Sequence, residues 1–594
     1  MIHYNLSFDT NKHMLRVRLR VDAPTPKGQI FRLPCWTPGS YCIRDYARHI
    51  VQISAKDCAT QKSISIDKIN NNTWVCEEAQ QLEVQYQIYA FDQSVRGCFI
   101  DSDRVFINGS TVFIEIDGFH DQPIEVELEP SAEQARFQVA TQLTPKAAEK
   151  WGWGTYSAQD YARLLDCPIT IGEITFLDFQ VDNKTHTIAL TGTVLGDLDK
   201  LKNDVQKICQ TQSDLFADSL PFDSYLFLLH LLEDGYGGLE HSDSTALIAA
   251  IQCMPIDKTD KSKYYQLLLG LFSHEYFHAW NVKRIKPDAF MPYDLNKPNY
   301  TRLLWVFEGF TSYYDDLGLV RSGTISAEDY LNTMAKNITR VIRGPGRHVQ
   351  SLVDSSFDAW TKFYFPNENT PNQGVSYYVK GAVVAYLMDI MIRVASEHQK
   401  SLDDVMRQLW ENYGKAKIGL TDEAIHNILV EMGVNPQFIQ EAIYGTDELP
   451  IEKILSSFGL ALEYKPRLQV ENFYPEATSP LPGQGVFGWQ LEKLADKVKV
   501  VSVFHKGAAI QAGISPKDDI VAINNIKTTI KSYDAICKRL KVEEVVTVTL
   551  FRENILKTIK VTLKQPELDV ASIQRIENNT EVQNKIIDDW LMGS

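Results

Sequence analysis

The period of the hydrophobic pattern changes twice along this chain of 594 residues, and each change limits the folds that the chain can adopt. Up to about residue 165, stretches such as "LRVRLRV" and "IEVELEP" alternate apolar and polar residues, as half-buried strands do. From Ser213 onward apolar residues follow helical spacing, and after about residue 465 short strands such as "VVTVTLF" return. The pattern therefore predicts a multidomain α+β protein.

We place the domain boundaries at these changes of period. A β-sandwich-like N-terminal domain is expected at residues 1–168, a largely helical domain at 169–464 and a small β-rich domain at 465–566. Residues 567–594, with the polar segment "ELDVASIQRIENNTEVQNKIIDDWL", form a tail that we expect to be helical.

Composition narrows the classes of partner and the cellular compartment. The formal net charge of −16 offers little to a polyanion, so nucleic-acid binding is not expected. The chain does not begin with a basic segment followed by an apolar run, and its longest apolar runs are too short to span a bilayer. The nine cysteines are scattered and form no C-x-x-C pair, which favours reduced thiols in the cytoplasm and argues against cysteine-bound zinc.

A candidate metal site begins in the stretch "HEYFH", where His274 and His278 stand four residues apart. Because the stretch follows the helix-compatible run "YYQLLLGLF", both imidazoles should lie on one face of a helix and reach one metal ion. Glu275 lies beside them, where a carboxylate can hold a metal-bound water molecule. The alternative is a pair of core or surface histidines with a chance glutamate.

A catalytic zinc ion takes three protein ligands and keeps one position open. The candidate third ligand is Glu308, 30 residues after His278 in the helical stretch "LLWVFEGFTSYYDDLG". Alternatively, Glu308 balances the dipole at a helix N-terminus. Asp315, seven residues further on, is either a hydrogen-bond partner of a ligand histidine or a solvated surface carboxylate.

This set of donors suits the hydrolysis of a peptide bond. A zinc ion lowers the pKa of its bound water and polarises a carbonyl, while Glu275 can take the proton and pass it to the leaving amine. A neutral donor to the developing oxyanion could come from Tyr377 or Tyr378 in "GVSYYVKG". Tyrosine pairs also serve as core packing, so both interpretations stay open at this point.

A second informative stretch, "LLHLLEDGYGGLEHSDSTALI", precedes the metal-site helix. Gly237 and Gly238 suggest a strand that another backbone approaches closely, and a substrate peptide could pair along its edge. Glu240 would then lie beside the first residue of the substrate, where a carboxylate can bind an α-ammonium group. The alternative is a glycine-rich turn with a solvated glutamate.

Five stretches in order, "GGLEH", "HEYFHAWNVKRIKP", "LWVFEGFTSYY", "SFDAWTKFY" and "SYYVKG", resemble the glycyl aminopeptidase family, which comprises PDZ-bearing gluzincin metallopeptidases related to aminopeptidase N. The segment "LPCWTPGSYCIRDYARHI" resembles the β domain of that family. The resemblance implies a thermolysin-like catalytic domain and one zinc ion per chain, bound by His274, His278 and Glu308. It implies Glu275 as the general base.

The same resemblance bears on substrate recognition. It implies that Glu240 binds the substrate amine and that Tyr378, rather than Tyr377, is the tyrosine of the Tyr-x-Lys-Gly pattern. Against wider relatives, Leu239 and His241 replace a methionine and an asparagine. The family prefers glycine, and to a lesser degree alanine, at the N-terminus of its substrates.

The stretch "GQGVFGWQLEK" and the later "AGISPKDDIVAINN" resemble a PDZ domain. Val486, Phe487, Gly488 and Trp489 occupy the place of its carboxylate-binding loop. Exposed backbone N–H groups there could bind a chain terminus, with the peptide added as a strand. A PDZ ligand, either a peptide or a C-terminal tail, is thus a possible second partner.

Our hypothesis is a cytoplasmic zinc aminopeptidase that acts on peptides with a free N-terminus. The alternative enzyme is a zinc endopeptidase whose PDZ domain holds substrate tails, but an endopeptidase has no use for an amine-binding carboxylate at Glu240. A catalytically silent scaffold whose PDZ domain is the working part is a further alternative. The complete set of ligands and base argues against it.

Overall fold

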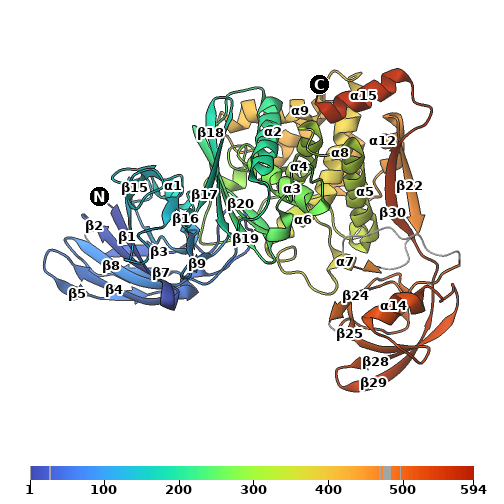
Figure 1. The fold of residues 1–594 in the computed structure, drawn as a ribbon, viewed down its shortest axis with the longest axis horizontal. Coiled ribbons are helices and arrows are strands. Elements are labelled where there is room, and N and C mark those ends of the chain that lie inside the picture. The colour runs from blue at the N-terminus through green and yellow to red at the C-terminus, as the bar shows by residue number, and fades with distance from the viewer. Residues whose placement is uncertain (1, 26–27, 467–469, 472–482, 495–496, 594) are drawn as a thin grey trace. The chain divides into compact units, whose positions relative to one another are not determined.

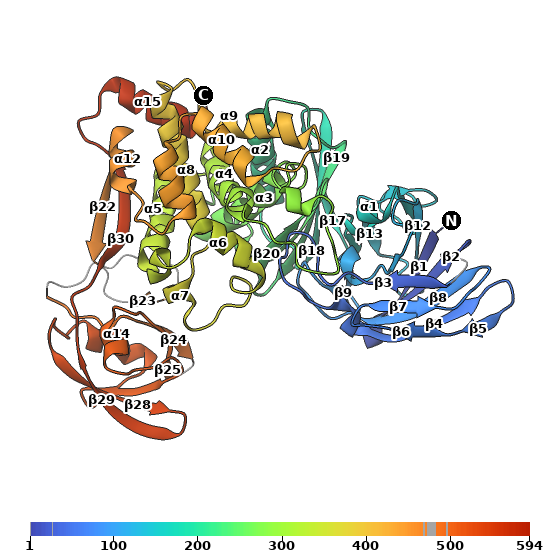
Figure 2. The ribbon, with the colours of Figure 1, turned by 180° about the vertical axis from the view of Figure 1, so that it is seen from behind.

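The computed structural model describes every residue except 1, 26–27, 467–469, 472–482, 495–496 and 594 (Figures 1 and 2). The fold is multidomain α+β, as the sequence predicts. The chain divides into two compact units: Met1–Asn299 with Arg407–Leu420, and Tyr300–Met406 with Thr421–Ser594. None of the described helices combines the length and the apolar composition that a bilayer crossing requires.

Three β-sheets make up the first part of unit one. The eight-stranded sheet has the order β14 (Thr144–Pro145), β15 (Gly154–Ala158), β12 (Ile124–Glu129), β1 (Ile2–Asp9), β2 (Met14–Val21), β8 (Leu82–Tyr89), β4 (Ile50–Asp57), β5 (Lys62–Ile64). The four-stranded sheets have the orders β13 (Gln138–Ala140), β16 (Ile169–Gly172), β10 (Arg104–Ile107), β9 (Cys98–Ile100) and β11 (Glu115–Ile116), β3 (Gln29–Arg32), β7 (Thr73–Cys76), β6 (Ile66–Lys68). A short helix, α1 (Tyr161–Leu165), precedes β16.

The alternation of apolar and polar residues explains why these segments form strands. In β2 every second residue from Leu15 to Val21 is buried, while the arginines between them face outward. β1 pairs with β2 in an antiparallel hairpin, and the inward residues of both strands join one core with Val84, Tyr86 and Ile124. Burial of one face of each strand therefore fixes the register of the sheet.

A five-stranded sheet forms the second part of unit one. Its order is β17 (Thr175–Val181), β18 (Lys184–Gly192), β19 (Ser224–Leu232), β21 (Ser244–Ala250), β20 (Tyr236–Glu240). β18, β19 and β21 are parallel, and β20 runs antiparallel to β21 at the edge. The continuous apolar run of β19 is typical of a central parallel strand that is covered on both faces. The helix α2 (Leu198–Phe216) connects β18 to β19, and the helix α3 (Lys263–Phe277) comes after β21 in the chain.

Unit two begins with helices around α8 (Val379–Ala395), whose residues are almost all buried, which explains why its sequence lacks a polar face. α5 (Ala327–Arg343) is strongly amphipathic and packs on α8. The remaining helices are α4 (Thr311–Arg321), α6 (Leu352–Phe357), α7 (Thr370–Gln373), α9 (Leu402–Leu409), α10 (Asp422–Glu431), α11 (Pro436–Ile439) and α12 (Ile451–Ser457).

The segment expected to be a helical tail is only partly helical. β30 (Leu568–Arg575) pairs antiparallel with β22 (Leu460–Pro466), and β30 packs against α5 (Figure 1). The backbone N–H of Ala571 donates a hydrogen bond of 2.9 Å to Oγ1 of Thr339 in α5. Within the described residues of this segment, 567–593, only α15 (Glu581–Met592) is helical. The burial of Val570, Ala571 and Ile573 in β30 depends on these distant partners, which the local sequence does not reveal.

The small β-rich domain completes unit two. Its sheet has the order β23 (Val470–Glu471), β24 (Trp489–Leu494), β25 (Lys497–Val503), β26 (Asp519–Ile523), β28 (Val545–Arg552), β29 (Ile555–Thr562), with β27 (Ile526–Lys527) paired to β26. The helices are α13 (Ala508–Gln511) and α14 (Ile530–Cys537). Trp489 is buried and its indole N–H donates to Oη of Tyr533 in α14 at 2.8 Å, which joins the sheet to the helix.

Candidate active site

The helix α3 carries the first half of the candidate metal site. Ser262 caps its N-terminus by accepting a hydrogen bond of 3.2 Å from the backbone N–H of Tyr265. His274 lies in the last turn, and the backbone N–H of His278, directly after the helix, donates to the carbonyl of His274. The two imidazoles therefore sit one turn apart, as the spacing predicts.

The hydrogen bonds of His278 define its tautomer. Nδ1 lies 2.8 Å from the backbone carbonyl oxygen of Asn281, which can only accept, so Nδ1 carries the proton. In the neutral imidazole Nε2 of His278 then carries the lone pair, and it lies 3.1 Å from Nε2 of His274. A neutral imidazole whose other nitrogen donates to a carbonyl is the usual state of a metal-binding histidine.

The turn after α3 positions that carbonyl. Val282 follows Asn281 with a φ angle of +98°, an unfavourable conformation for a β-branched residue. The turn is held by hydrogen bonds from the N–H of Val282 to Ile285 and from the N–H of Lys283 to the carbonyl of His278. The strained turn thus brings the Asn281 carbonyl to the imidazole of His278.

Glu308 lies in a π-helical turn, η6 (Trp305–Phe310), that runs directly into α4. All six residues of the turn are buried, and Glu308 is 2% exposed. The sequence predicts a helix here but does not predict that its first turn is π-helical. Such π-helical turns are frequently found at functional sites. Gly309 allows the turn to approach α8 closely, because a Cβ there would lie 2.6 Å from Cα of Gly381.

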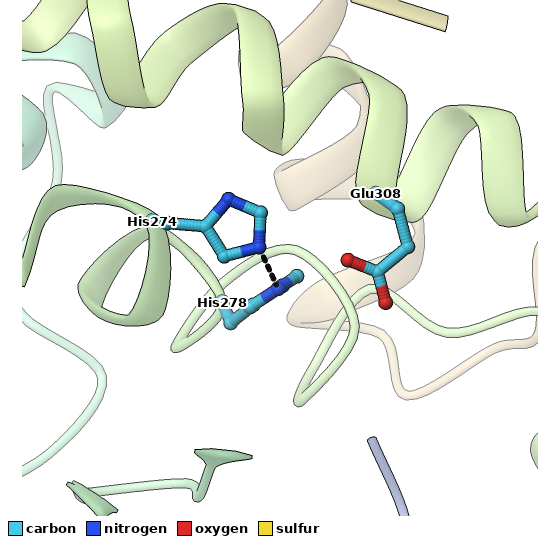
Figure 3. Close-up of side chains that lie close together, drawn as sticks. All are labelled: His274, His278 and Glu308. Atoms are coloured by element: carbon cyan, nitrogen blue, oxygen red, sulfur yellow. Dashed lines mark hydrogen bonds between the residues drawn. The ribbon is translucent and has the colours of Figure 1, made fainter. Parts of the chain in front are cut away.

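Figure 3 shows the side chains of His274, His278 and Glu308, the three ligands that the sequence predicts. Each offers one potential ligand atom, and the three atoms lie within 4.8 Å of one another. Two imidazole nitrogens and a carboxylate oxygen suit zinc. The donor set and the tautomer of His278 therefore fit a catalytic zinc ion.

The edge strand β20 brings Glu240 and Gly238 to α3. The ligand atoms of Glu240, Glu275 and His278 also lie within 4.8 Å of one another, and all three residues are buried. A Cβ on Gly238 would overlap the carboxylate of Glu275. The alternative of a solvated glutamate in a turn is therefore wrong for Glu240, which is 5% exposed at the end of a strand.

Gly39 is a residue of this site that the sequence analysis did not identify. It has a φ angle of +88°, and a Cβ there would overlap the carboxylate of Glu240. Gly39 belongs to the stretch "TPGSY", whose Pro-Gly pair signals a turn but does not reveal the partner. The N-terminal β domain therefore contributes a loop to the surroundings of Glu240.

The imidazole of His241 bonds to Asp166, which explains why a histidine can follow Glu240. Nδ1 of His241 lies 3.3 Å from Asp166, and the ammonium of Lys283 lies 2.8 Å from the same carboxylate oxygen. Burial alone would raise the pKa of Asp166, but Lys283 and the hydrogen bond of His241 hold this pKa well below its usual value. This ion pair ties β20 to the turn that follows α3.

The two candidate tyrosines differ in exposure. Tyr377 is 0% exposed, and burial raises the pKa of its phenol well above the usual value. Tyr378, which directly precedes α8, is half-buried, and the two ring centroids lie 4.8 Å apart. Tyr378 therefore retains a surface that a substrate could contact. Asp315 lies half-buried on α4.

Three family models and a full-length relative agree with this architecture. The Peptidase M61 N-terminal domain family matches residues 3–173, the M61 glycyl aminopeptidase family matches residues 267–384 and the PDZ domain family matches residues 485–563. An aminopeptidase N family protein from Idiomarina loihiensis is similar at 35% sequence identity, over 100% of both chains and with a TM-score of 0.95. An M1 zinc metallopeptidase from Deinococcus radiodurans is 12% identical over 76% of this chain and 95% of that chain, with a TM-score of 0.46.

A comparison with curated proteins gives no match. The full-length likeness at 35% identity and the three family matches confirm the resemblance that the sequence motifs suggest. The chain belongs to the M61 glycyl aminopeptidase family and is a metallopeptidase of the aminopeptidase type.

Proposed function

We propose that this protein is a zinc-dependent aminopeptidase that removes the first residue of peptides and prefers glycine or alanine at that position. The observation that carries the proposal is the placement of Glu240. Its buried carboxylate lies within 4.8 Å of the potential ligand atoms of Glu275 and His278, at the end of an edge strand. A buried carboxylate beside a metal ligand is where the ammonium group of a substrate's first residue can be neutralised.

One zinc ion per chain would be held by His274, His278 and Glu308. The ion supplies Lewis-acid polarisation of the scissile carbonyl and lowers the pKa of a bound water. The neutral tautomer of His278 and the three converging donors support this assignment. We further propose that Asp315, on the helix that follows Glu308, supports a ligand histidine through a hydrogen bond.

Three side chains of this protein would transfer protons, stabilise the oxyanion and position the substrate. Glu275 takes the proton from the attacking water and delivers it to the leaving amine. Tyr378 donates a hydrogen bond to the oxyanion that develops on the substrate carbonyl. Glu240 pairs with the α-ammonium group, which presents the first peptide bond to the reacting groups.

The backbone of β20 would align the substrate. Among the residues that the structure describes, β20 pairs with β21 on one side only, and we propose that its other edge, where Arg96 donates a hydrogen bond of 3.4 Å to the carbonyl of Gly238, takes the added peptide strand. Gly237 and Gly238 add no Cβ to the β20 backbone where the peptide would approach. Because Gly39 and Glu240 pack together at the end of β20, the space there is limited, which supports a preference for small first residues.

The test compares matched peptides with free and acetylated N-termini, beginning with glycyl and alanyl chromogenic amides. The aminopeptidase proposal requires that acetylation nearly abolish hydrolysis, because the Glu240 carboxylate then lacks its ammonium partner. Internal cleavage of acetylated peptides at a comparable rate would establish the zinc endopeptidase alternative instead. Metal analysis of the same preparation measures the zinc content per chain.

We also propose a cytoplasmic location for the enzyme. All nine cysteines are free thiols, and eight of them are buried. Free thiols in this number suit a reducing compartment. Measurement of nine reactive thiols in the denatured protein, purified without added reductant, is the corresponding test.

A further inference from the structure

The N-terminal β domain contributes an arginine to the edge of β20. Arg96 lies in the loop between β8 and β9, and its Nη2 donates a hydrogen bond of 3.4 Å to the backbone carbonyl of Gly238. A Cβ atom on Gly237 would lie 3.8 Å from Nη1 of the same guanidinium. Arg96 therefore places a positive charge beside the strand edge along which the substrate is proposed to bind.

Hydrogen bonds and packing hold the loop of Arg96 against the five-stranded sheet. Oη of Tyr46 donates to the backbone carbonyl of Arg96 at 3.0 Å, and Nδ2 of Asn108 donates to the carbonyl of Val95 at 3.2 Å. The side chain of Val95 is 2% exposed and belongs to one hydrophobic cluster with Leu239 of β20. The backbone at position 96 is therefore fixed relative to β20, whereas the long side chain of Arg96 can still turn about its own bonds.

The guanidinium of Arg96 has unused hydrogen-bonding capacity. An arginine guanidinium carries several N–H donors, and in the described part of the chain only Nη2 of Arg96 has an acceptor. Nε is buried and has no hydrogen-bond partner among the described residues. Because an unpaired buried donor costs free energy, an anion that accepts hydrogen bonds from Arg96 would be favoured.

The pairing of β20 with β21 shows which backbone groups of β20 face its free edge. The turn between the two strands is closed by a hydrogen bond of 2.9 Å from the N–H of His241 to the carbonyl of Ser244. In an antiparallel pair, residues that bond to the partner strand alternate with residues that do not. By this alternation from His241, the N–H and C=O groups of Glu240 and Gly238 point away from β21. The hydrogen bond from Arg96 to Gly238 agrees with this register.

The spacing along β20 sets the length of a peptide that would reach from Glu240 to Arg96. Glu240 and Gly238 are two residues apart, which is about 7 Å in a strand. An extended dipeptide also spans about 7 Å from its ammonium group to its carboxylate. A dipeptide whose ammonium group pairs with Glu240 therefore brings its carboxylate to the carbonyl of Gly238, beside the guanidinium of Arg96.

We propose that Arg96 binds the C-terminal carboxylate of dipeptide substrates, so that the enzyme prefers dipeptides to longer peptides. The inference rests on the proposed function, in which Glu240 binds the ammonium group. Arg96 turns from the Gly238 carbonyl and takes both carboxylate oxygens through two of its N–H groups. In a longer peptide the second residue carries a neutral carbonyl, which accepts a weaker hydrogen bond than a carboxylate does.

The test measures kcat/KM for the dipeptide Gly-Leu and for its amide, Gly-Leu-NH2, on the full chain. The ratio of acid to amide isolates the effect of the carboxylate, because a general loss of activity in a variant affects both substrates and cancels. The parent enzyme should prefer the acid by about tenfold, because a charge-assisted hydrogen bond replaces a neutral one. A parent enzyme that cleaves the amide as well as the acid would overturn the proposal.

Matched variants assign the preference to Arg96. Arg96→Gln should lose the preference for the acid, because the amide side chain keeps a donor but carries no charge. Arg96→Lys keeps the charge without the two-pronged geometry and should retain part of the preference. The control is Arg18→Gln at an exposed arginine of β2, which removes the same charge from the same domain and should keep the ratio of the parent. An unchanged ratio in Arg96→Gln would refute the role of Arg96.

A tripeptide pair tests the register and separates this inference from the proposed function. In Gly-Leu-Gly the carboxylate lies one residue beyond Arg96, so its ratio of acid to amide should be close to unity and should not respond to Arg96→Gln. An equal preference for the acid in dipeptide and tripeptide would overturn the assignment to dipeptides. If glycyl chromogenic amides are cleaved but no preference for the acid depends on Arg96, this inference alone is wrong. If no substrate with a free amine is cleaved, the proposed function is wrong and this inference falls with it.

Discussion

Gly238 of the edge strand β20 packs against Glu275 of α3 so closely that a Cβ atom at position 238 would overlap the Glu275 carboxylate. The neighbouring Gly237 has ample space, since a Cβ there would lie 3.8 Å from Nη1 of Arg96. The two glycines of "GGLEH" therefore have different roles, although they look equivalent in the sequence. Gly238 sets the position of the proposed general base against the strand that would hold the substrate.

Gly238→Ala should lower kcat/KM by about 10² or more, because the added methyl group displaces Glu275 from the reacting atoms. Gly270→Ala, on α3 where an added Cβ would meet no atom within 4 Å, is the control and should stay within a few-fold of the parent enzyme. Steady-state kinetics on glycyl chromogenic amides measure both. A Gly238→Ala variant as active as the control would mean that the overlap is relieved without moving Glu275.

Glu308→Ala should sharply reduce the zinc content, because it removes one of three proposed protein ligands. Glu275→Gln should retain the metal and lose nearly all turnover, because the amide cannot accept a proton. Metal analysis by mass spectrometry and single-turnover kinetics distinguish the two outcomes. Full zinc occupancy in Glu308→Ala would exclude this residue as a ligand, and loss of zinc in Glu275→Gln would give Glu275 a structural role.

Glu240→Ala should weaken transition-state binding of free-amine peptides by about 2–5 kcal/mol, because their ammonium group loses its carboxylate partner. The zinc content should not change. Acetylated peptides, which carry no ammonium group, should lose much less on this substitution. The measurement is kcat/KM for matched free and acetylated peptides on both proteins, and a loss of zinc in the variant would indicate that Glu240 is itself a ligand.

Tyr378→Phe should reduce kcat by about 10²–10³ with little change in KM, the pattern of a donor that acts in the transition state. Tyr377→Phe should have a small effect on kcat, since Tyr377 is completely buried and packs against Tyr378. If the phenol of Tyr377 were the donor, the two results would be exchanged.

The burial of Lys380 should make the stability of the native state depend on pH. It is 2% exposed, its Nζ has no hydrogen-bond partner among the described residues, and burial lowers its pKa to about 8. An unfolded lysine has a pKa of about 10.4, so between these values the unfolded chain binds more protons and the stability of the native state rises with pH.

Lys380→Met should therefore stabilise the protein at pH 7 by about 1–3 kcal/mol, with an advantage that shrinks between about pH 8 and 10. The exposed Lys400→Met serves as the control and should change little. Thermal unfolding of the variants and the parent across this pH range measures the difference. An advantage that is independent of pH would contradict the assigned titration of Lys380.

The local geometry of the candidate site follows from short spacings. The four-residue interval between His274 and His278 places both imidazoles on one face of a helix, and this placement does not depend on the tertiary structure. The alternation in β2 and the continuous apolar run of β19 predict a half-buried and a fully buried strand for the same reason. Neighbours in sequence determine these patterns, so the sequence alone is sufficient to predict them.

Contacts between distant segments required the tertiary structure. Gly39 lies 201 positions before Glu240 in the chain, and Arg343 lies more than 140 positions before Gly488, yet each pair shares one small space. The π-helical turn at Glu308 depends on the close approach of Gly309 to Gly381, and β30 depends on β22. The period of the apolar residues shows only that one face of a helix or strand is buried. Which segment covers that face depends on the packing of the whole domain. The sequence therefore determined the chemistry of the side chains and their local spacing, and the tertiary packing decided which of them meet.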